Sequence, residues 1–131
     1  MISNNQAPIQ SGFNSKSKSS DVLEGINLKD KLAIITGGYS GIGFETTKGL
    51  KAAGADIIIP AKRTDIACQN LKGIVPEKNI MHMDLADLNS VRKFTESVNE
   101  NFSKLDILIN NAGIMACPET RIGNNWESQF A

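Results

Sequence analysis

Beyond residue 30, the chain alternates short apolar segments with longer segments of mixed polarity. The short segments are apolar almost throughout, which is typical of strands that are buried on both faces of a sheet. We therefore expect four strands, at 31–36, 56–60, 79–84 and 105–110. The mixed segments predict helices at 41–53 and 64–72, each followed by a glycine, and a third helix that begins after Asp87.

Two polar residues are expected to cap these helices. Thr64 stands at the start of the second helix, and Asp87 stands before the third. The third helix has an apolar residue at every third or fourth position: Leu88, Val91, Phe94, Val98 and Phe102. Such spacing places one apolar stripe on one face of a helix.

The order of these elements predicts an α/β fold. Strand and helix alternate three times before the fourth strand, which favours a parallel sheet covered on both faces. Right-handed crossovers in the doubly wound, Rossmann-like order give the spatial order 3-2-1-4, with the first two helices on one face and the third on the other. The fourth strand would be an unprotected apolar edge, so we expect the N-terminal half of a larger domain that continues beside it.

The first part of the chain has a different composition. Residues 1–28 are predicted to be a polar N-terminal extension, and residues 29–131 the partial α/β domain. Within the extension, Asp21 and Glu24 are expected to be a capping pair that opens a short helix, which Gly25 ends.

Composition removes several classes of function. The 14 Lys and Arg residues balance the 14 Asp and Glu residues, so we expect no nucleic-acid or anionic-membrane partner. The apolar segments are too short to span a membrane. The N-terminus has no apolar core of a secretory signal, and Cys68 and Cys117 form no CxxC pair, which favours a cytoplasmic protein with free thiols.

The segment "TGGYSGIG" at 36–43 lies where the first strand turns into the first helix. A helix N-terminus offers unpaired N–H groups and a partial positive charge, which suit a pyrophosphate. Gly37 and Gly41 suit the turn and a close backbone approach, and Gly43 would let the first helical turn pack against the strand.

The glycine segment departs from two known phosphate-binding patterns. Phe44 and Glu45 stand where a P-loop requires Lys and Ser or Thr. Thr46 stands where the third small residue of G-x-G-x-x-G belongs. Taken alone, the segment therefore also fits an ordinary strand-to-helix turn.

Polar residues also follow the other three strands, at the edge where such sheets bind ligands. Lys62 and Arg63 follow the second strand, and two cations there suit the 2′-phosphate of an adenosine ribose. Asp84 and Leu85 follow the third strand, and "NNAG" at 110–113 follows the fourth. Each feature alone also fits a solvated strand end, a helix start or a turn.

Together and in this order, "TGGYSGIG", "DL" and "NNAG" resemble the short-chain dehydrogenase/reductase family over residues 31–131. "DILINNAGIMACPE" and "WESQFA" are similar to its retinol-dehydrogenase-like and protochlorophyllide-reductase-like branch. The resemblance implies a Rossmann-like NAD(P)-binding domain in an oxidoreductase that transfers a hydride between NADP(H) and an alcohol or carbonyl. That small molecule would be its partner, and a homo-oligomer of the full-length protein stays open.

The resemblance also assigns cofactor-binding residues. The pyrophosphate and its ribose would lie at Gly37, Ser40, Gly41, Ile42 and Gly43, the 2′-phosphate at Lys62 and Arg63, the adenine at Asp84 and Leu85, and the nicotinamide ribose at Asn111, Ala112 and Gly113. Basic residues after the second strand predict NADP(H) in preference to NAD(H). Ser40 departs from the basic residue that many NADP-preferring members carry before Gly41.

The family's catalytic residues do not occur in this sequence. The family uses a Ser, an Asn and a Tyr-x-x-x-Lys pair, in which the Lys lowers the pKa of the Tyr. The only tyrosine, Tyr39, is followed four positions later by Gly43. His82, the only histidine, has no metal-ligand spacing around it. We therefore expect this chain alone to be an inactive fragment, and a non-catalytic dinucleotide-binding module or an inactive truncated product stay open as alternatives.

Overall fold

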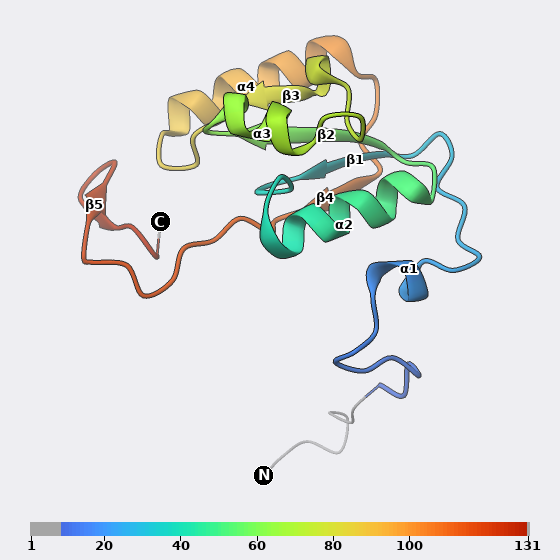
Figure 1. The fold of residues 1–131 in the computed structure, drawn as a ribbon. Helices are drawn as coiled ribbons and strands as arrows, with labels where there is room; N and C mark the ends of the chain where they lie inside the picture. The colour runs from blue at the N-terminus through green and yellow to red at the C-terminus, as the bar shows by residue number, and fades with distance from the viewer. Residues whose placement is uncertain (1–8, 131) are drawn as a thin grey trace.

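The computed structural model describes residues 9–130 of the 131-residue chain. Its centre is a sheet of four parallel strands in the order β3-β2-β1-β4, as predicted (Figure 1). The strands are β1 Leu32–Ile35, β2 Asp56–Ala61, β3 Ile80–His82 and β4 Ile107–Ile109. The carboxyl ends of all four strands therefore meet at one edge of the sheet, where the predicted polar residues follow.

Helices cover both faces of this sheet, as predicted (Figure 1). The helical elements beside the sheet are α2 Gly41–Ala52, α3 Thr64–Asn70, the short 3₁₀ helix η1 Glu77–Asn79 and α4 Leu88–Asn101. Leu50 of α2 and Leu71 after α3 are buried against one face. Phe94 and Val98 of α4 are buried against the other face.

The strands supply both halves of the core because successive side chains point to opposite faces. Ile57 and Ile59 of β2 join the cluster under α2 and α3, whereas Ile58 between them joins the cluster under α4. All three are at most 1% exposed. Burial on both faces explains why the strand segments are apolar throughout rather than alternating.

One of the two predicted helix caps is confirmed and the other is wrong. Asp87 caps α4, since its side chain accepts a hydrogen bond from the N–H of Asn89 at 2.9 Å. Thr64 is instead the first helical residue of α3, and no side chain caps that helix.

The short N-terminal helix begins earlier than expected. It is α1 Ser19–Val22, which starts two residues before the predicted Asp21. Asp21 lies inside the first turn and accepts a hydrogen bond from the N–H of Lys18 at 2.9 Å, while Glu24 lies beyond the helix end. The helix rests on α2: the Ser19 hydroxyl donates to the carbonyl of Glu45, and a Cβ at Gly49 would lie 2.8 Å from that of Ser19.

A two-stranded hairpin near the C-terminal end was not predicted. Strands β5 Arg121–Ile122 and β6 Trp126–Glu127 pair antiparallel, and Gly123 and Asn125 between them have positive φ angles of 55° and 70°. Two-residue strands leave too little alternation in the sequence to be recognised.

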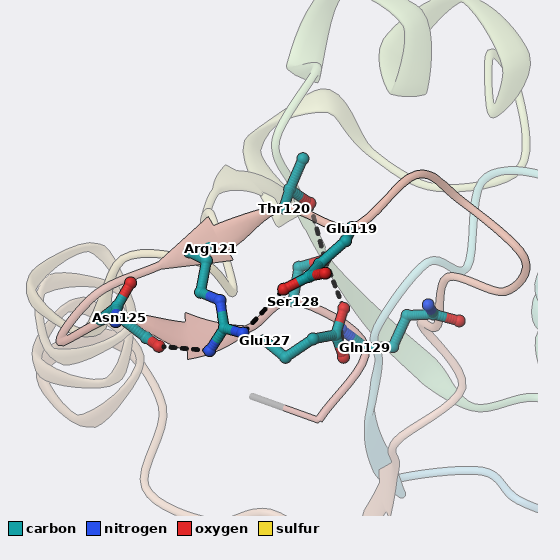
Figure 2. A network of polar contacts seen from close by, with 7 residues as sticks. All are labelled: Glu119, Thr120, Arg121, Asn125, Glu127, Ser128 and Gln129. Carbon is teal, nitrogen blue, oxygen red and sulfur yellow. Dashed lines mark hydrogen bonds and ion pairs between the residues drawn. The ribbon is translucent and has the colours of Figure 1, made fainter.

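A polar network holds this hairpin together (Figure 2). The guanidinium of Arg121 lies 2.7 Å from a carboxylate oxygen of Glu119, and the hydroxyls of Thr120 and Ser128 are 2.8 Å apart. Arg121 also donates to the carbonyl of Asn125. These contacts lie between nearby residues, so the segment folds back on itself.

Asp106 joins two strands at the amino ends of the sheet, opposite to the carboxyl ends where the predicted polar residues lie. Its carboxylate accepts from the N–H of Leu32 at 2.9 Å and contacts the ammonium groups of Lys31 and Lys104 at 3.1 and 3.3 Å. The Leu32 hydrogen bond, together with these cations, lowers the pKa of Asp106 to about 2. The carboxylate thus ties the start of β4 to the start of β1.

We predict that Asp106→Asn destabilises the protein at neutral pH and that the difference from the wild type shrinks in acid. The folded-state pKa of about 2 lies below the ordinary value of 3.8, so the unfolded chain binds more protons between those pH values. The contribution of the carboxylate is therefore present above pH 3.8 and is lost as the pH falls toward 2. Urea unfolding at several pH values measures this difference, and a difference independent of pH would contradict the prediction.

Candidate functional site

A cleft of about 510 Å³ lies at the carboxyl ends of the parallel strands. Six of the twelve predicted cofactor residues line it: Gly37, Lys62, Asp84, Leu85, Ala112 and Gly113. The other six do not: Ser40, Gly41, Ile42, Gly43, Arg63 and Asn111. Tyr39 and Pro60 also line it near the glycine turn, and Ile122, Ser128 and Gln129 of the hairpin segment line its far side.

Thr36, at the end of β1, joins the two sides of this cleft. Its side-chain oxygen accepts hydrogen bonds from the N–H groups of Asn111 at 3.0 Å and Ala112 at 2.9 Å. In return, the side-chain amide of Asn111 donates to the carbonyl of Thr36 at 3.0 Å and contacts that of Gly37 at 3.4 Å. The segment after β4 is thus fixed to the glycine turn after β1.

This arrangement gives the side chain of Asn111 a role inside the protein, and its predicted contact with a ribose stays a prediction. Its side-chain amide is used inside the protein, whereas Ala112 and Gly113 line the cleft. Sequence reasoning missed Thr36 as a positioning residue. The available signal was its place as the first residue of "TGGYSGIG", directly after the apolar strand.

The glycines of the turn meet different demands. Gly37 and Gly41 have positive φ angles of 64° and 52°, in keeping with their predicted place in the turn. A Cβ at Gly43 would lie 2.4 Å from both the Asn111 amide nitrogen and the Gly37 carbonyl oxygen. We expected Gly43 to let the helix pack against the strand. Its neighbours are instead the Gly37 carbonyl in the turn and the Asn111 side chain in the segment after β4. Gly38 has no room for a side chain either, because a Cβ there would lie 2.7 Å from the side chains of Ile59 and Thr47.

The N-terminus of α2 suits an anion. Gly41 begins this 12-residue helix, and a Cβ there would meet no atom within 4 Å, so a ligand can approach the backbone. Ser40 makes no side-chain capping bond, and the first turn contains no acidic residue. The helix dipole and the first N–H groups favour a phosphate at such a position. The residues present therefore fit the pyrophosphate of a dinucleotide.

The cation predicted to bind a 2′-phosphate is already paired. The ammonium of Lys62 lies 2.8 Å from a carboxylate oxygen of Asp84, across the ends of β2 and β3. This hydrogen bond raises the pKa of Lys62 and lowers the pKa of Asp84. Two residues predicted to contact different parts of a cofactor thus contact each other.

Arg63 does not join this pair. Its guanidinium lies 3.3 Å from the carboxylate of Asp65, and this hydrogen bond raises the pKa of Arg63. Both residues are exposed, with 62% and 69% of their side-chain surfaces accessible. The structure therefore places only Lys62 of the two predicted cations on the cleft wall.

Tyr39 is a wall residue that sequence reasoning considered only as a catalytic acid and rejected. Its backbone carbonyl accepts a hydrogen bond from the side-chain amide of Asn70 at 3.0 Å, which joins the glycine turn to α3. On the far side, Gln129 accepts from the N–H of Ala116 at 3.1 Å and so joins the hairpin segment to the loop after β4. Within residues 9–130, no group of three metal-ligating side chains could hold a metal ion.

We predict that Gly43→Ala lowers the free energy of unfolding by about 3 kcal/mol, the upper end of the range for overpacking a close contact. The added methyl would collide with the Gly37 carbonyl and the Asn111 amide. Gly73→Ala is the matched control, because that glycine has a φ of 78° but open space around its Cβ, and should cost about 1 kcal/mol. Equal losses in urea unfolding would contradict the packing role of Gly43.

Comparisons with known proteins identify the family of this chain. A family model described as short chain dehydrogenase matches residues 31–130. Short-chain dehydrogenase TIC 32 B, chloroplastic, of Brassica napus is 41% identical over 127 residues, which cover 93% of this chain and 40% of that protein. Retinol dehydrogenase 13 of Homo sapiens is 36% identical over 105 residues, which cover 76% and 32%.

A solved structure shares the fold as well. The RhlG/NADP active-site complex of Pseudomonas aeruginosa is 30% identical with a TM-score of 0.58, covering 68% of this chain and 37% of that one. The chain thus spans about two fifths or less of the proteins that it matches. By the family model, the sequence relatives and the sheet order, the chain belongs to the short-chain dehydrogenase family.

Proposed function

We propose that the protein is an NAD(P)-dependent oxidoreductase that transfers a hydride between NADP(H) and an alcohol or carbonyl, and that this chain supplies the dinucleotide site. The observation that carries the proposal is the open N-terminus of α2 at Gly41, beside a cleft that the Thr36 hydrogen bonds hold together. Membership of the short-chain dehydrogenase family supports the same chemistry.

Each wall of the cleft has a proposed part in binding. The first turn of α2 would hold the pyrophosphate through its N–H groups. Lys62 and Asp84 would lie at the adenosine end, and the backbone at Ala112 and Gly113 would lie along the nicotinamide ribose. The preference for NADP(H) over NAD(H) rests on Lys62 and Arg63, and the NADP complex of a similar structure is in keeping with it.

The nicotinamide would supply the hydride when bound. The residues of this chain would bind and orient it, because the sequence holds no Tyr-x-x-x-Lys pair for the proton. We therefore expect the chain alone to bind the dinucleotide without turnover, so that a non-catalytic binding module is the second candidate.

Partner and location are part of the same proposal. Retinol dehydrogenase 13 and a polyprenol dehydrogenase of Danio rerio, similar at 36% identity, are named for alcohols, which supports an alcohol or carbonyl as substrate. Within residues 9–130, no helix has both the length and the apolar content needed to cross a bilayer. A cytoplasmic location, the absence of nucleic-acid and membrane partners, and a homo-oligomer remain predictions.

Titration of the full-length protein with NADPH and with NADH, followed by nucleotide fluorescence, tests the dinucleotide site. Gly41→Asp should weaken binding of both by about tenfold relative to Gly41→Asn, because a carboxylate there would repel the pyrophosphate at short range. The two variants match in shape and in the positive φ that they must adopt. Absence of binding by the wild type, or equal affinities of the two variants, would contradict the proposal.

Turnover tests the enzymatic part separately. The full-length protein should oxidise NADPH in the presence of a suitable carbonyl compound, whereas the 131-residue chain should not. Binding without turnover by the full-length protein, across alcohols and carbonyls of different size, would favour the non-catalytic module.

A further inference from the structure

We propose that Asp84 is a specificity-determining residue that weakens binding of a 2′-phosphate by holding Lys62. The inference rests on the proposed dinucleotide site and concerns its adenosine end. Lys62 would attract a 2′-phosphate, whereas Asp84 would weaken its binding. The carboxylate of Asp84 pairs with the ammonium of Lys62 and also repels the phosphate.

Asp84 is the fixed member of the pair. Its carboxylate accepts a hydrogen bond from the N–H of Ala86 at 3.0 Å, and its own N–H donates to the hydroxyl of Ser90 at 2.9 Å. Only 25% of its side-chain surface is exposed, against 65% for Lys62. The long lysine side chain must therefore move if the pair is to open.

The charges at this end of the cleft cancel. Lys62 is paired with Asp84, and Arg63 is paired with Asp65. A phosphate of nearly two negative charges would therefore meet Lys62 on the cleft wall already neutralised by Asp84, and Arg63 beyond the wall already neutralised by Asp65. To contact Lys62, it would have to separate that ammonium from Asp84 and remain close to the carboxylate, which costs free energy through like-charge repulsion.

A dinucleotide without a 2′-phosphate does not require Lys62 to separate from Asp84. NADH can occupy the cleft while the Lys62–Asp84 pair stays closed, whereas NADPH must open it. The pair therefore lowers the preference for NADPH below that expected from two basic residues after β2. Removal of the Asp84 charge should raise that preference.

The ratio of the NADH and NADPH dissociation constants, measured on the full-length protein, tests this inference. Asp84→Asn should raise the ratio in favour of NADPH by about fivefold or more, the size of one charge contact at about 4 Å in water. The amide can still accept from Ala86, so the local turn is retained. Any contact of Asp84 with adenine affects both nucleotides and cancels in the ratio.

Two further variants separate the mechanism from general electrostatics. Asp56→Asn removes an equal charge from an ion pair with Lys51, at the opposite end of β2, and should leave the ratio unchanged. In a Lys62→Gln background, Asp84→Asn should raise the ratio less than it does in the wild type, because no ammonium is released.

Each outcome bears on a distinct statement. A ratio unchanged by Asp84→Asn, or changed equally by Asp56→Asn, would overturn this inference while leaving the dinucleotide site intact. A wild type that binds neither nucleotide would overturn the proposed function and this inference with it. A rise that is confined to Asp84→Asn and reduced without Lys62 would support the inference.

Discussion

The hydrogen bonds of Thr36 are the interaction on which the site depends. One side-chain oxygen at the end of β1 accepts from the N–H groups of both Asn111 and Ala112, and so fixes the segment after β4 beside the glycine turn. Gly43 then lets α2 approach this junction, since a methyl group there would collide with it. The open N-terminus of α2 and the cleft wall at Ala112 and Gly113 owe their relative positions to this contact. The apolar sheet carries both segments, and the hydrogen bonds of Thr36 fix them side by side at the cleft.

The fold could be predicted because its signals are local and repeated. Ile57, Ile58 and Ile59 alternate between two covered faces, so an apolar strand of this kind already implies helices on both sides. Right-handed crossovers in the doubly wound, Rossmann-like order then give 3-2-1-4, which the structure confirms. Helix starts were harder, because Asp21 and Thr64 lie within first turns instead of before them. Residue types that favour a cap do not fix the turn position at which they act.

The candidate site could be located from the sequence but not described in detail. Topology brings the ends of all four strands to one edge, so the residues after them had to converge. Which of those residues contact each other depends on side-chain reach: Lys62 extends to Asp84, whereas Arg63 pairs with Asp65 in the first turn of α3. The contact of Asn111 with Thr36 and the position of the hairpin beside the cleft also depend on residues far apart in the sequence. No spacing in the sequence encodes these choices, and they set the charge that a ligand would meet.

Hydrogen exchange of the full-length protein with and without NADPH tests the central claim that this cleft is the dinucleotide site. NADPH should slow exchange of the backbone N–H groups at 37–44, the glycine turn and the start of α2, and at 110–114, the segment after β4. Exchange should stay unchanged at 72–77, which lines a separate cavity beside Cys68 and serves as the internal reference. Protection confined to 72–77, or no protection at 37–44 under saturating NADPH, would contradict the account.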